Sequence, residues 1–233
     1  MIYVTSDLHG FTARELQALL AKAGFAAEDE LYVLGDVIDR NGEGGIDTLR
    51  WLMEQPNAEL LMGNHEAMLL SCTFMFDEIT ETFCDTLENG DQLTRLVTWT
   101  HNGAKPTIDA LRKLMKEEPS AVFDLLDYLR DAPMYAMVEA GGRDFLLLHG
   151  GLKDFSPDKK LSAYEPHDIL WHRPDWDETY FDDVTVVLGH TPTALYGAEY
   201  SGRMLVRPTW IDIDTSNVKP MLLRLDDMQA FYG

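Results

Sequence analysis

Short apolar runs alternate with amphipathic segments along the first part of the chain. The runs at 1–6, 31–34 and 58–62 have the length and residue types of buried strands. After the first run, a capping box of Thr12 and Glu15 precedes apolar residues at helical spacing, namely Leu16, Leu19, Leu20 and Ala23. A second amphipathic helix is expected before the third run. This succession predicts βαβ units and a parallel sheet.

The middle of the chain, from about 67 to 131, has a helical pattern with breaks at Asn89-Gly90, Asn102-Gly103, Pro106 and Pro119. We interpret it as a helical insertion packed over one edge of the sheet. Its polar segment 99–103 has two interpretations. It is either a loop that overhangs a pocket or a connection between two helices, and the second is favoured.

The pattern of short strands returns after the insertion. The runs 134–140 and 143–148 predict a hairpin that turns at Gly141-Gly142, and 184–188 predicts another buried strand. Three more strands and a short last one are expected in the tail, near 204–206, 210–213, 221–225 and after Asp226-Asp227. We expect this tail to be antiparallel. No linker or repeat interrupts the chain, so residues 1–233 are predicted to form one domain.

The formal net charge is −21, from 40 acidic and 19 basic residues. Nucleic acids and anionic membranes repel an acidic surface, so neither is expected as a partner. No apolar run is long enough to span a membrane, and no secretory signal precedes the first strand. Cys72 and Cys84 lack the CxxC spacing, so we favour buried thiols over metal ligation and expect a reducing, cytoplasmic location.

Polar motifs follow five of the predicted strands: Asp7-Leu8-His9, Gly35-Asp36-Val37-Ile38-Asp39-Arg40, Gly63-Asn64-His65-Glu66, His149-Gly150-Gly151 and Gly189-His190-Thr191. Each motif alone is a weak indication, because a single histidine is more often structural than a ligand. Together they supply the oxygen and nitrogen donors that Mn²⁺, Fe²⁺ and Zn²⁺ accept. Ligands of parallel sheets collect at the carboxyl ends of strands, which is where these motifs fall.

These motifs resemble those of the calcineurin-like metallophosphoesterases, most closely the PPP-type serine/threonine phosphatases in their small bacterial and phage form. They occur in the family's order from Asp7 to His190, and 211–215 is similar to the family's closing strand. The resemblance implies an α/β fold, a four-layer α/β/β/α sandwich of two mixed sheets flanked by helices. The family usually has Gly where this chain has Asn41, and Asn tolerates the left-handed conformation that such a turn needs.

The resemblance also implies a dinuclear metal centre. Asp7 and His9 would bind one divalent ion, Asp36 would bridge the two, and the second ion would be bound by Asn64, His149 and His190. A hydroxide shared by the ions is the expected nucleophile, and hydrolysis would be direct. Mn²⁺ is the favoured ion, with Fe and Zn²⁺ also compatible with these ligands.

The resemblance assigns the remaining roles as follows. His65 would be the general acid with Asp39 as its carboxylate partner, while Arg40 and Arg173 would bind the substrate phosphate. Glu66 is interpreted as support for the start of a helix. No role is implied for His101, His167 and His172, which are treated either as structural or as residues that support the site from behind its ligands.

Three functions are compatible with these residues. The favoured one is a serine/threonine protein phosphatase that hydrolyses phosphomonoesters. The second is a hydrolase of symmetrical dinucleoside tetraphosphates or of another small phosphorylated molecule. Those relatives commonly lack an acid at the position of Asp39, and its presence here favours the protein phosphatase. The third, a metal-stabilised binding module without catalysis, is less favoured because every ligand position and His65 are intact.

Overall fold

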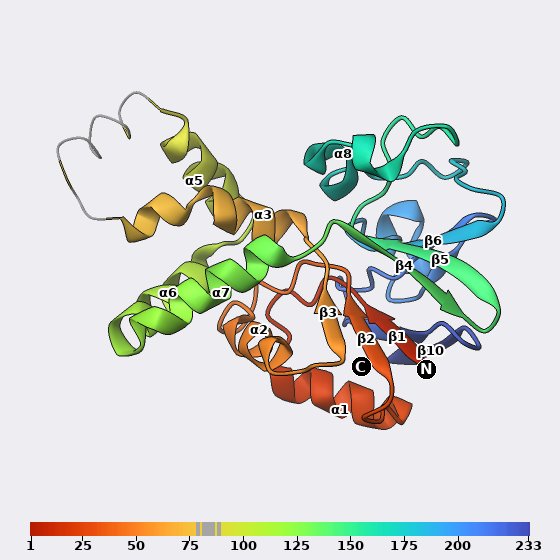
Figure 1. Cartoon of the computed structure of the whole chain (residues 1–233), viewed down its shortest axis with the longest axis horizontal. Coiled ribbons are helices and arrows are strands. Elements are labelled where there is room, and N and C mark those ends of the chain that lie inside the picture. Colours follow the sequence, from red (N-terminus) through yellow and green to blue (C-terminus); the bar gives the residue numbers. More distant parts are fainter. Residues whose placement is uncertain (78–79, 81–86, 88–89) are drawn as a thin grey trace.

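The computed structural model describes residues 1–77, 80, 87 and 90–233, which form two five-stranded mixed sheets (Figure 1). The first sheet has the order β10-β9-β1-β2-β3, with bounds Gln229–Tyr232, Met221–Arg224, Ile2–Thr5, Glu30–Val33 and Ala58–Leu60. The second has the order β4-β5-β6-β8-β7, with bounds Tyr135–Ala140, Arg143–Leu148, Val184–Leu188, Trp210–Asp212 and Leu205–Val206.

The parallel part of the first sheet follows the predicted βαβ units. β1 pairs with β2 and β2 with β3, both in parallel. Helix α1 (Ala13–Ala23) connects β1 to β2, and helix α2 (Ile46–Met53) connects β2 to β3. Both halves of the predicted capping box of Thr12 and Glu15 are present at the start of α1. Gly24 ends this helix in the left-handed conformation with φ 78°.

Alternating side chains on the strands separate three layers of hydrophobic core. On β5, Phe145 and Leu147 face the core between the two sheets, while Leu146 and Leu148 face the outer core of the second sheet. On β1, Val4 belongs to the core between the sheets, and its neighbour Tyr3 packs in the core shared with α1 and α2. The predicted four-layer α/β/β/α arrangement is therefore confirmed.

The remaining helices cover the sheets unevenly. Helices α3 (Asn64–Ser71), α5 (Gln92–His101), α6 (Lys105–Glu117) and α7 (Pro119–Asp131) and the 3₁₀ turn η1 (Thr73–Phe76) gather on the side of α2 (Figure 1). The outer face of the second sheet is covered mainly by loops, by helix α8 (Pro166–Leu170), and by the 3₁₀ turns η2 (Leu161–Ala163), η3 (Thr193–Tyr196) and η4 (Ala198–Tyr200).

The expectation of an antiparallel tail is correct only in part. β7 and β8 are antiparallel, as are β9 and β10, but β8 lies parallel to β6. The tail also divides between the two sheets, because β9 crosses to the first sheet and pairs with β1. Local hydrophobic pattern finds strands but does not tell which neighbour a strand will take.

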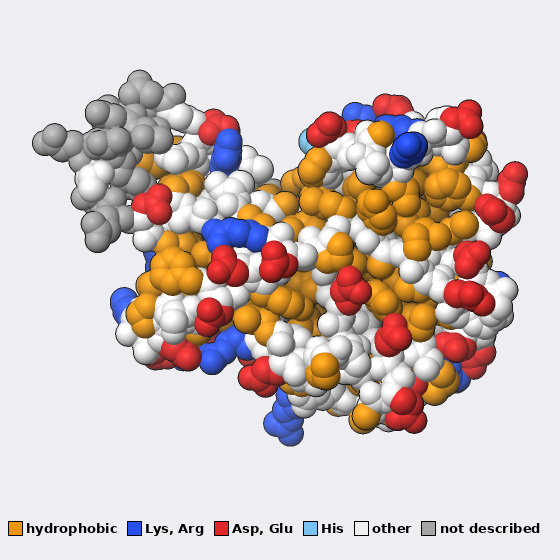
Figure 2. Space-filling model, viewed as in Figure 1, with side chains coloured by type: hydrophobic (Ala, Val, Ile, Leu, Met, Phe, Trp, Pro, Cys, Tyr) orange, Lys and Arg blue, Asp and Glu red, His pale blue; other side chains and the backbone are white. Residues whose placement is uncertain are grey.

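Acidic side chains are scattered over much of the face in Figure 2, and hydrophobic side chains gather across its centre, from beside α7 to β4 and β5. Among the residues that the structure describes, no helix is long and apolar enough to cross a membrane. Cys72 is buried and free, as expected, while Cys84 lies outside the described residues.

Candidate metal centre

The predicted ligands follow the carboxyl ends of strands from both sheets. Asp7 and His9 come after β1, and Asp36 comes after β2. Asn64 is the first residue of α3, directly after the segment that leaves β3. The second sheet contributes His149 after β5 and His190 after β6. All six side chains are buried, although they lie as far as 183 residues apart in the chain.

Two glycines allow these strand ends to approach one another. A Cβ added to Gly35 would lie 2.4 Å from Cα of Gly63, and one added to Gly189 would lie 2.3 Å from Oδ2 of Asp7. Neither distance is possible for a real Cβ atom, so a larger residue at either position would push two ligand-bearing segments apart.

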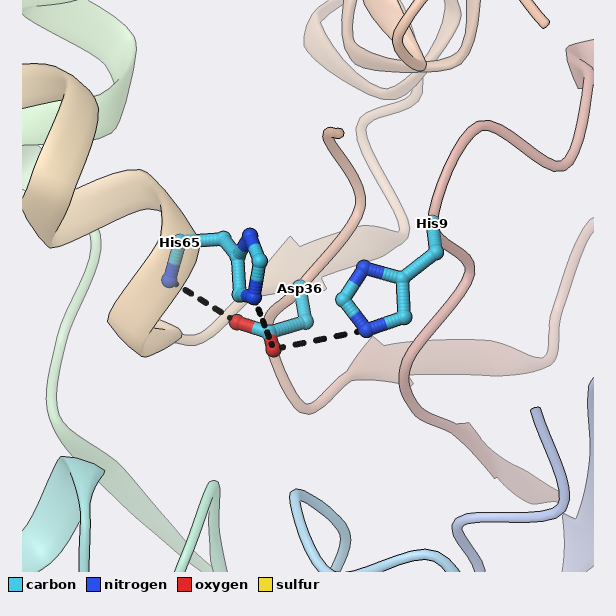
Figure 3. A group of neighbouring side chains, drawn as sticks. All are labelled: His9, Asp36 and His65. Atoms are coloured by element: carbon cyan, nitrogen blue, oxygen red, sulfur yellow. Dashed lines mark hydrogen bonds and ion pairs between the residues drawn. The ribbon is translucent and has the colours of Figure 1, made fainter. Parts of the chain in front are cut away.

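Asp36 lies between two histidines in the first group of side chains (Figure 3). Its Oδ2 is 3.6 Å from Nε2 of His9 and 3.7 Å from Nε2 of His65. His9 Nδ1 is 3.1 Å from the carbonyl oxygen of Ile38, which can only accept, so Nδ1 carries the proton. Nε2 of His9 therefore presents a lone pair to the carboxylates of Asp36 and Asp7.

A second group shares Asp36 and adds ligands from the second sheet. His149 Nδ1 donates to the carbonyl of Leu34 at 2.6 Å, so its Nε2 also presents a lone pair. That nitrogen lies 2.8 Å from Oδ1 of Asn64 and 3.4 Å from Oδ1 of Asp36. The backbone N–H of His190 donates to Asp7 at 2.9 Å, which ties the two sheets together. Electron-pair donors that face one another at these distances fit a cation between them.

The electrostatics of the cluster also fit a bound cation. Burial, together with Asp7 and Glu66, raises the pKa of Asp36 well above its ordinary value. Burial lowers the pKa of both His9 and His190 to about 3, so both rings are neutral at physiological pH. Nε2 of each of these two histidines has no hydrogen-bond partner among the described residues. Buried carboxylates that lack a positive partner and neutral imidazoles with free lone pairs are what divalent cations bind.

His65 and Asp39 form a close pair beside this cluster. His65 Nδ1 lies 2.6 Å from Oδ2 of Asp39, and both side chains are almost fully buried. Nε2 of the same ring lies 3.2 Å from Nη2 of Arg40. The structure thus brings together the three residues that were assigned to proton donation and phosphate binding.

Arg173 follows α8 at the rim of the cluster, and its side chain is exposed. Burial and the neighbouring His149 are the larger causes of the low pKa of His190, and the positive charge of Arg173 adds to them. His172, its neighbour, faces away toward Glu178, with 2.9 Å between Nε2 and the carboxylate. An exposed guanidinium close to His190 is free to meet an anionic substrate.

Glu66 lies in the first turn of α3, as interpreted from the sequence, and it has a second role that the sequence did not indicate. Its buried carboxylate also accepts hydrogen bonds from the loop that follows β2. The donors are the backbone N–H groups of Asp36 at 2.8 Å, Val37 at 2.9 Å and Ile38 at 3.2 Å. This side chain therefore holds the turn that carries Asp36. An acid directly after two site residues is the sequence feature that could have suggested the role.

Two further residues that contact Asp39 come from the helical middle of the chain. Trp99 Nε1 donates to Oδ2 of Asp39 at 2.7 Å, and Thr107 Oγ1 donates to Oδ1 at 2.5 Å. The segment 99–103 is the end of α5 and a short connection to α6, which is the interpretation that the sequence favoured. Trp99 nevertheless contacts the candidate site through Asp39. No motif in the sequence indicated either contact.

Asn41 also differs from its interpretation. The left-handed conformation falls on the two residues before it, Asp39 with φ 76° and Arg40 with φ 67°. Asn41 itself is not among the described residues with positive φ, and its side chain donates to the carbonyl of His9 at 3.0 Å. Asn41 therefore joins the Asp36 turn to the segment after β1 through a hydrogen bond.

A sandwich of two mixed sheets, with histidine, carboxylate and amide side chains gathered at its strand ends, is typical of a metal-dependent phosphoesterase. The profile of one such family, the calcineurin-like phosphoesterases, matches residues 1–214. The chain therefore belongs to the calcineurin-like phosphoesterase family, as its motifs predicted.

Several curated relatives are named symmetrical bis(5'-nucleosyl)-tetraphosphatases. The protein of Actinobacillus succinogenes is 31% identical over 163 residues, which are 69% of this chain and 46% of that protein. The protein of Haemophilus ducreyi is 30% identical over 164 residues, which are 69% of this chain and 47% of the relative. The chain thus spans about half the length of these relatives.

Solved structures show the same fold at low identity. A candidate diadenosine tetraphosphatase superposes with a TM-score of 0.61 and 18% identity, covering 100% of this chain and 92% of the other. A serine/threonine phosphatase from Saccharomyces cerevisiae superposes with a TM-score of 0.57 and 14% identity, covering 100% and 79%.

Proposed function

We propose that this chain hydrolyses phosphoesters with the help of two divalent metal ions that share Asp36. The observation that carries the proposal is that Asp36 belongs to both groups of buried donor side chains, one with His9 and His65 and one with His149 and His190. Asp7 and Asn64 complete the two ligand sets. When bound, the ions would supply a nucleophilic water at neutral pH and would offset the charge of the phosphoryl oxygens.

The chain's own residues would bind the phosphate and protonate the leaving group. Arg40 and Arg173 would hold phosphoryl oxygens, since a guanidinium presents paired donors to such a group. Arg40 now lies 3.2 Å from His65 Nε2 and must turn toward the phosphate before that nitrogen can carry a proton. As the bond from phosphorus to the leaving oxygen breaks, its electron pair stays on that oxygen, which takes the Nε2 proton of His65.

For the substrate we favour a dinucleoside polyphosphate, cleaved to two nucleotides. The support is the name shared by the curated relatives, at 31% identity for the protein of Actinobacillus succinogenes. We therefore favour a hydrolase of dinucleoside tetraphosphates over the serine/threonine protein phosphatase that the sequence favoured. Mn²⁺ remains the ion that we propose, with Fe and Zn²⁺ as alternatives.

A phosphoserine or phosphothreonine protein is the second candidate substrate. The observation in its favour is the 2.6 Å contact between Asp39 and His65, because the acid at position 39 resembles the protein phosphatases rather than the tetraphosphatases. A poor alkoxide leaving group also needs a well-placed general acid more than a nucleotide leaving group does.

A substrate panel tests the proposal. The metal-loaded protein would be assayed with diadenosine tetraphosphate, a phosphothreonine peptide and p-nitrophenyl phosphate, each with Mn²⁺, Fe²⁺ or Zn²⁺. We expect two ADP molecules per diadenosine tetraphosphate and a kcat/KM at least about tenfold above that for the peptide. The reverse preference would assign a protein phosphatase. A protein that binds metal but turns over no substrate would be a binding module without catalysis. Asp36→Asn is the control, expected to lose both metal and turnover.

A further inference from the structure

Both oxygens of the Asp39 carboxylate are held by side chains from the helical middle of the chain. Oδ2 accepts from Trp99 Nε1 at 2.7 Å as well as from His65 Nδ1 at 2.6 Å. Oδ1 accepts from Thr107 Oγ1 at 2.5 Å, and the same hydroxyl accepts from the backbone N–H of Asp39 at 3.0 Å. Asp39, Trp99 and Thr107 are all fully buried. The carboxylate therefore has no freedom to rotate away from His65.

The connection between α5 and α6 also fixes the backbone next to Asp39. Trp99 is in the last turn of α5 and Thr107 in the first turn of α6. Between them, the carbonyl of Gly103 accepts from the backbone N–H of Arg40 at 3.0 Å. On the other side of the turn, a Cβ added to Gly44 would lie 2.4 Å from the backbone nitrogen of Thr107. The helix connection thus packs directly on the strained turn at Asp39 and Arg40.

We infer that Trp99 and Thr107 are positioning residues for proton donation by His65. They act through Asp39, whose orientation decides where Nε2 of the ring points. The indole N–H is well suited to this task, because it donates to the carboxylate and does not titrate, so its hydrogen bond persists at every working pH. The helices between α3 and β4 would then contribute to the chemistry itself. The inference rests on the proposed phosphoester hydrolysis.

The competing explanation is that both residues only fill the core, since Trp99 belongs to the cluster that packs α1, α2 and α7. The dependence of rate on the leaving group separates the two. A general acid matters most when the leaving oxygen is basic, as in phenyl phosphate, and little when it is weakly basic, as in p-nitrophenyl phosphate. A loss of core packing alone would slow both substrates equally.

The test compares two variants that remove the hydrogen-bond donor. Trp99→Phe keeps an aromatic ring, and Thr107→Val keeps the branched shape of the side chain. Kinetics would be measured on the Mn²⁺-loaded full chain with phenyl phosphate and p-nitrophenyl phosphate. We expect each variant to lose about tenfold more kcat with phenyl phosphate than with p-nitrophenyl phosphate. This loss would be part of the ~10²–10⁴-fold contribution of a general acid. Metal content should equal that of the wild type. When Asp39→Asn is already present, adding Trp99→Phe should not lower kcat with phenyl phosphate any further relative to kcat with p-nitrophenyl phosphate.

Matched controls exist for both substitutions. Thr48→Val removes another fully buried hydroxyl, which donates to the carbonyl of Phe11 instead. Trp51→Phe alters another tryptophan that packs against the same core. Both controls should leave the ratio of kcat with phenyl phosphate to kcat with p-nitrophenyl phosphate unchanged.

Two results would overturn the inference while leaving the proposed function standing. One is an equal loss of kcat on both substrates, and the other is a loss from Trp99→Phe that adds in full to the loss from Asp39→Asn. If Trp99→Phe does not fold, the kinetics of Thr107→Val alone test the inference. A metal-loaded wild type that hydrolyses neither of these substrates nor diadenosine tetraphosphate would overturn both the inference and the proposed function.

Discussion

At the scale of single residues, the centre is built from backbone conformations that most amino acids avoid. Of the described non-glycine residues, eight have positive φ, and six of these are predicted site residues: Asp7, His9, Asp36, Asp39, Arg40 and His190. Asp and His tolerate this region better than most residues, but each instance still costs about 1–3 kcal/mol. The surrounding hydrogen bonds must therefore hold the backbone in place. Those from Glu66 to the turn at Asp36 are the clearest case.

Glu66→Gln should weaken metal binding. The amide of Gln offers one acceptor oxygen, where the carboxylate now serves three backbone N–H groups, and its NH₂ would face one of those donors. Asp36 would lose its fixed orientation, and we expect metal affinity to fall about 10–100-fold. Isothermal titration with Mn²⁺ would measure it. Glu178→Gln, which alters the carboxylate that faces His172, is the control and should bind metal as the wild type does.

His65→Asn tests the division between acid and ligand. Nε2 of His65 lies 3.7 Å from Asp36 and the ring belongs to a group that could hold an ion, so distance alone does not separate the roles. We expect kcat to fall by about 10²–10⁴-fold with metal content unchanged, because Asn64 and not His65 is the proposed ligand. Metal analysis and kinetics on the same preparation would check this. Loss of an ion would show that His65 is a ligand.

At the scale of elements, glycines set how closely the helices and turns pack. Gly24 and Gly44 both have left-handed φ, at 78° and 65°, but their surroundings differ. A Cβ on Gly24 would meet nothing within 4 Å, whereas one on Gly44 would collide with the backbone of Thr107 at the start of α6. The first glycine serves only the end of α1, and the second lets α6 pack against the Asp39 turn.

This pair gives a matched comparison of stability. Gly24→Ala should lower the free energy of unfolding by about 1 kcal/mol, from the left-handed conformation alone. Gly44→Ala has the same strain and an additional collision, so the loss should be larger by about 1–3 kcal/mol. Urea unfolding of both variants would measure the difference. Equal midpoints would mean that α6 moves away without cost.

At the scale of the whole molecule, the two sheets bring strand ends from distant parts of the chain to one place. Asp36 of the first sheet faces His149 and His190 of the second. Asp212, the last residue of β8, and Asp214 are buried near the same region, and burial raises the pKa of Asp214 to about 8. The chain thus concentrates buried acids where its sheets meet, and bound cations would hold the two sheets together.

The metal-free protein should therefore become less stable as pH rises from about 4 to about 8. In this window folded Asp214 keeps a proton that the unfolded chain, with an ordinary pKa of 3.8, has already released. Each such group lowers the free energy of unfolding by up to about 1.4 kcal/mol per pH unit. Thermal unfolding in EDTA at several pH values would show the slope.

Two further measurements belong to the same experiment. Asp214→Asn should flatten the slope, because Asn keeps an acceptor for Ser216 without the charge. Saturating Mn²⁺ should raise the melting temperature, and more at high pH, because the ions bind only the folded state. Stability that rises with pH in EDTA would contradict the assignment of Asp214.

The sequence by itself determined the family and the strand-terminal motifs, because polar motifs and hydrophobic periodicity are written locally along the chain. The capping box at Thr12 and the hairpin at Gly141-Gly142 were predictable for the same reason. The donor set from Asp7 to His190 stays a prediction. Only the tertiary structure decided that β8 joins β6 in parallel, that Glu66 serves the loop of Asp36, and that Trp99 and Thr107 reach Asp39. These contacts join residues 28 to 68 positions apart or strands from distant segments. They depend on how whole elements pack, which no local pattern specifies.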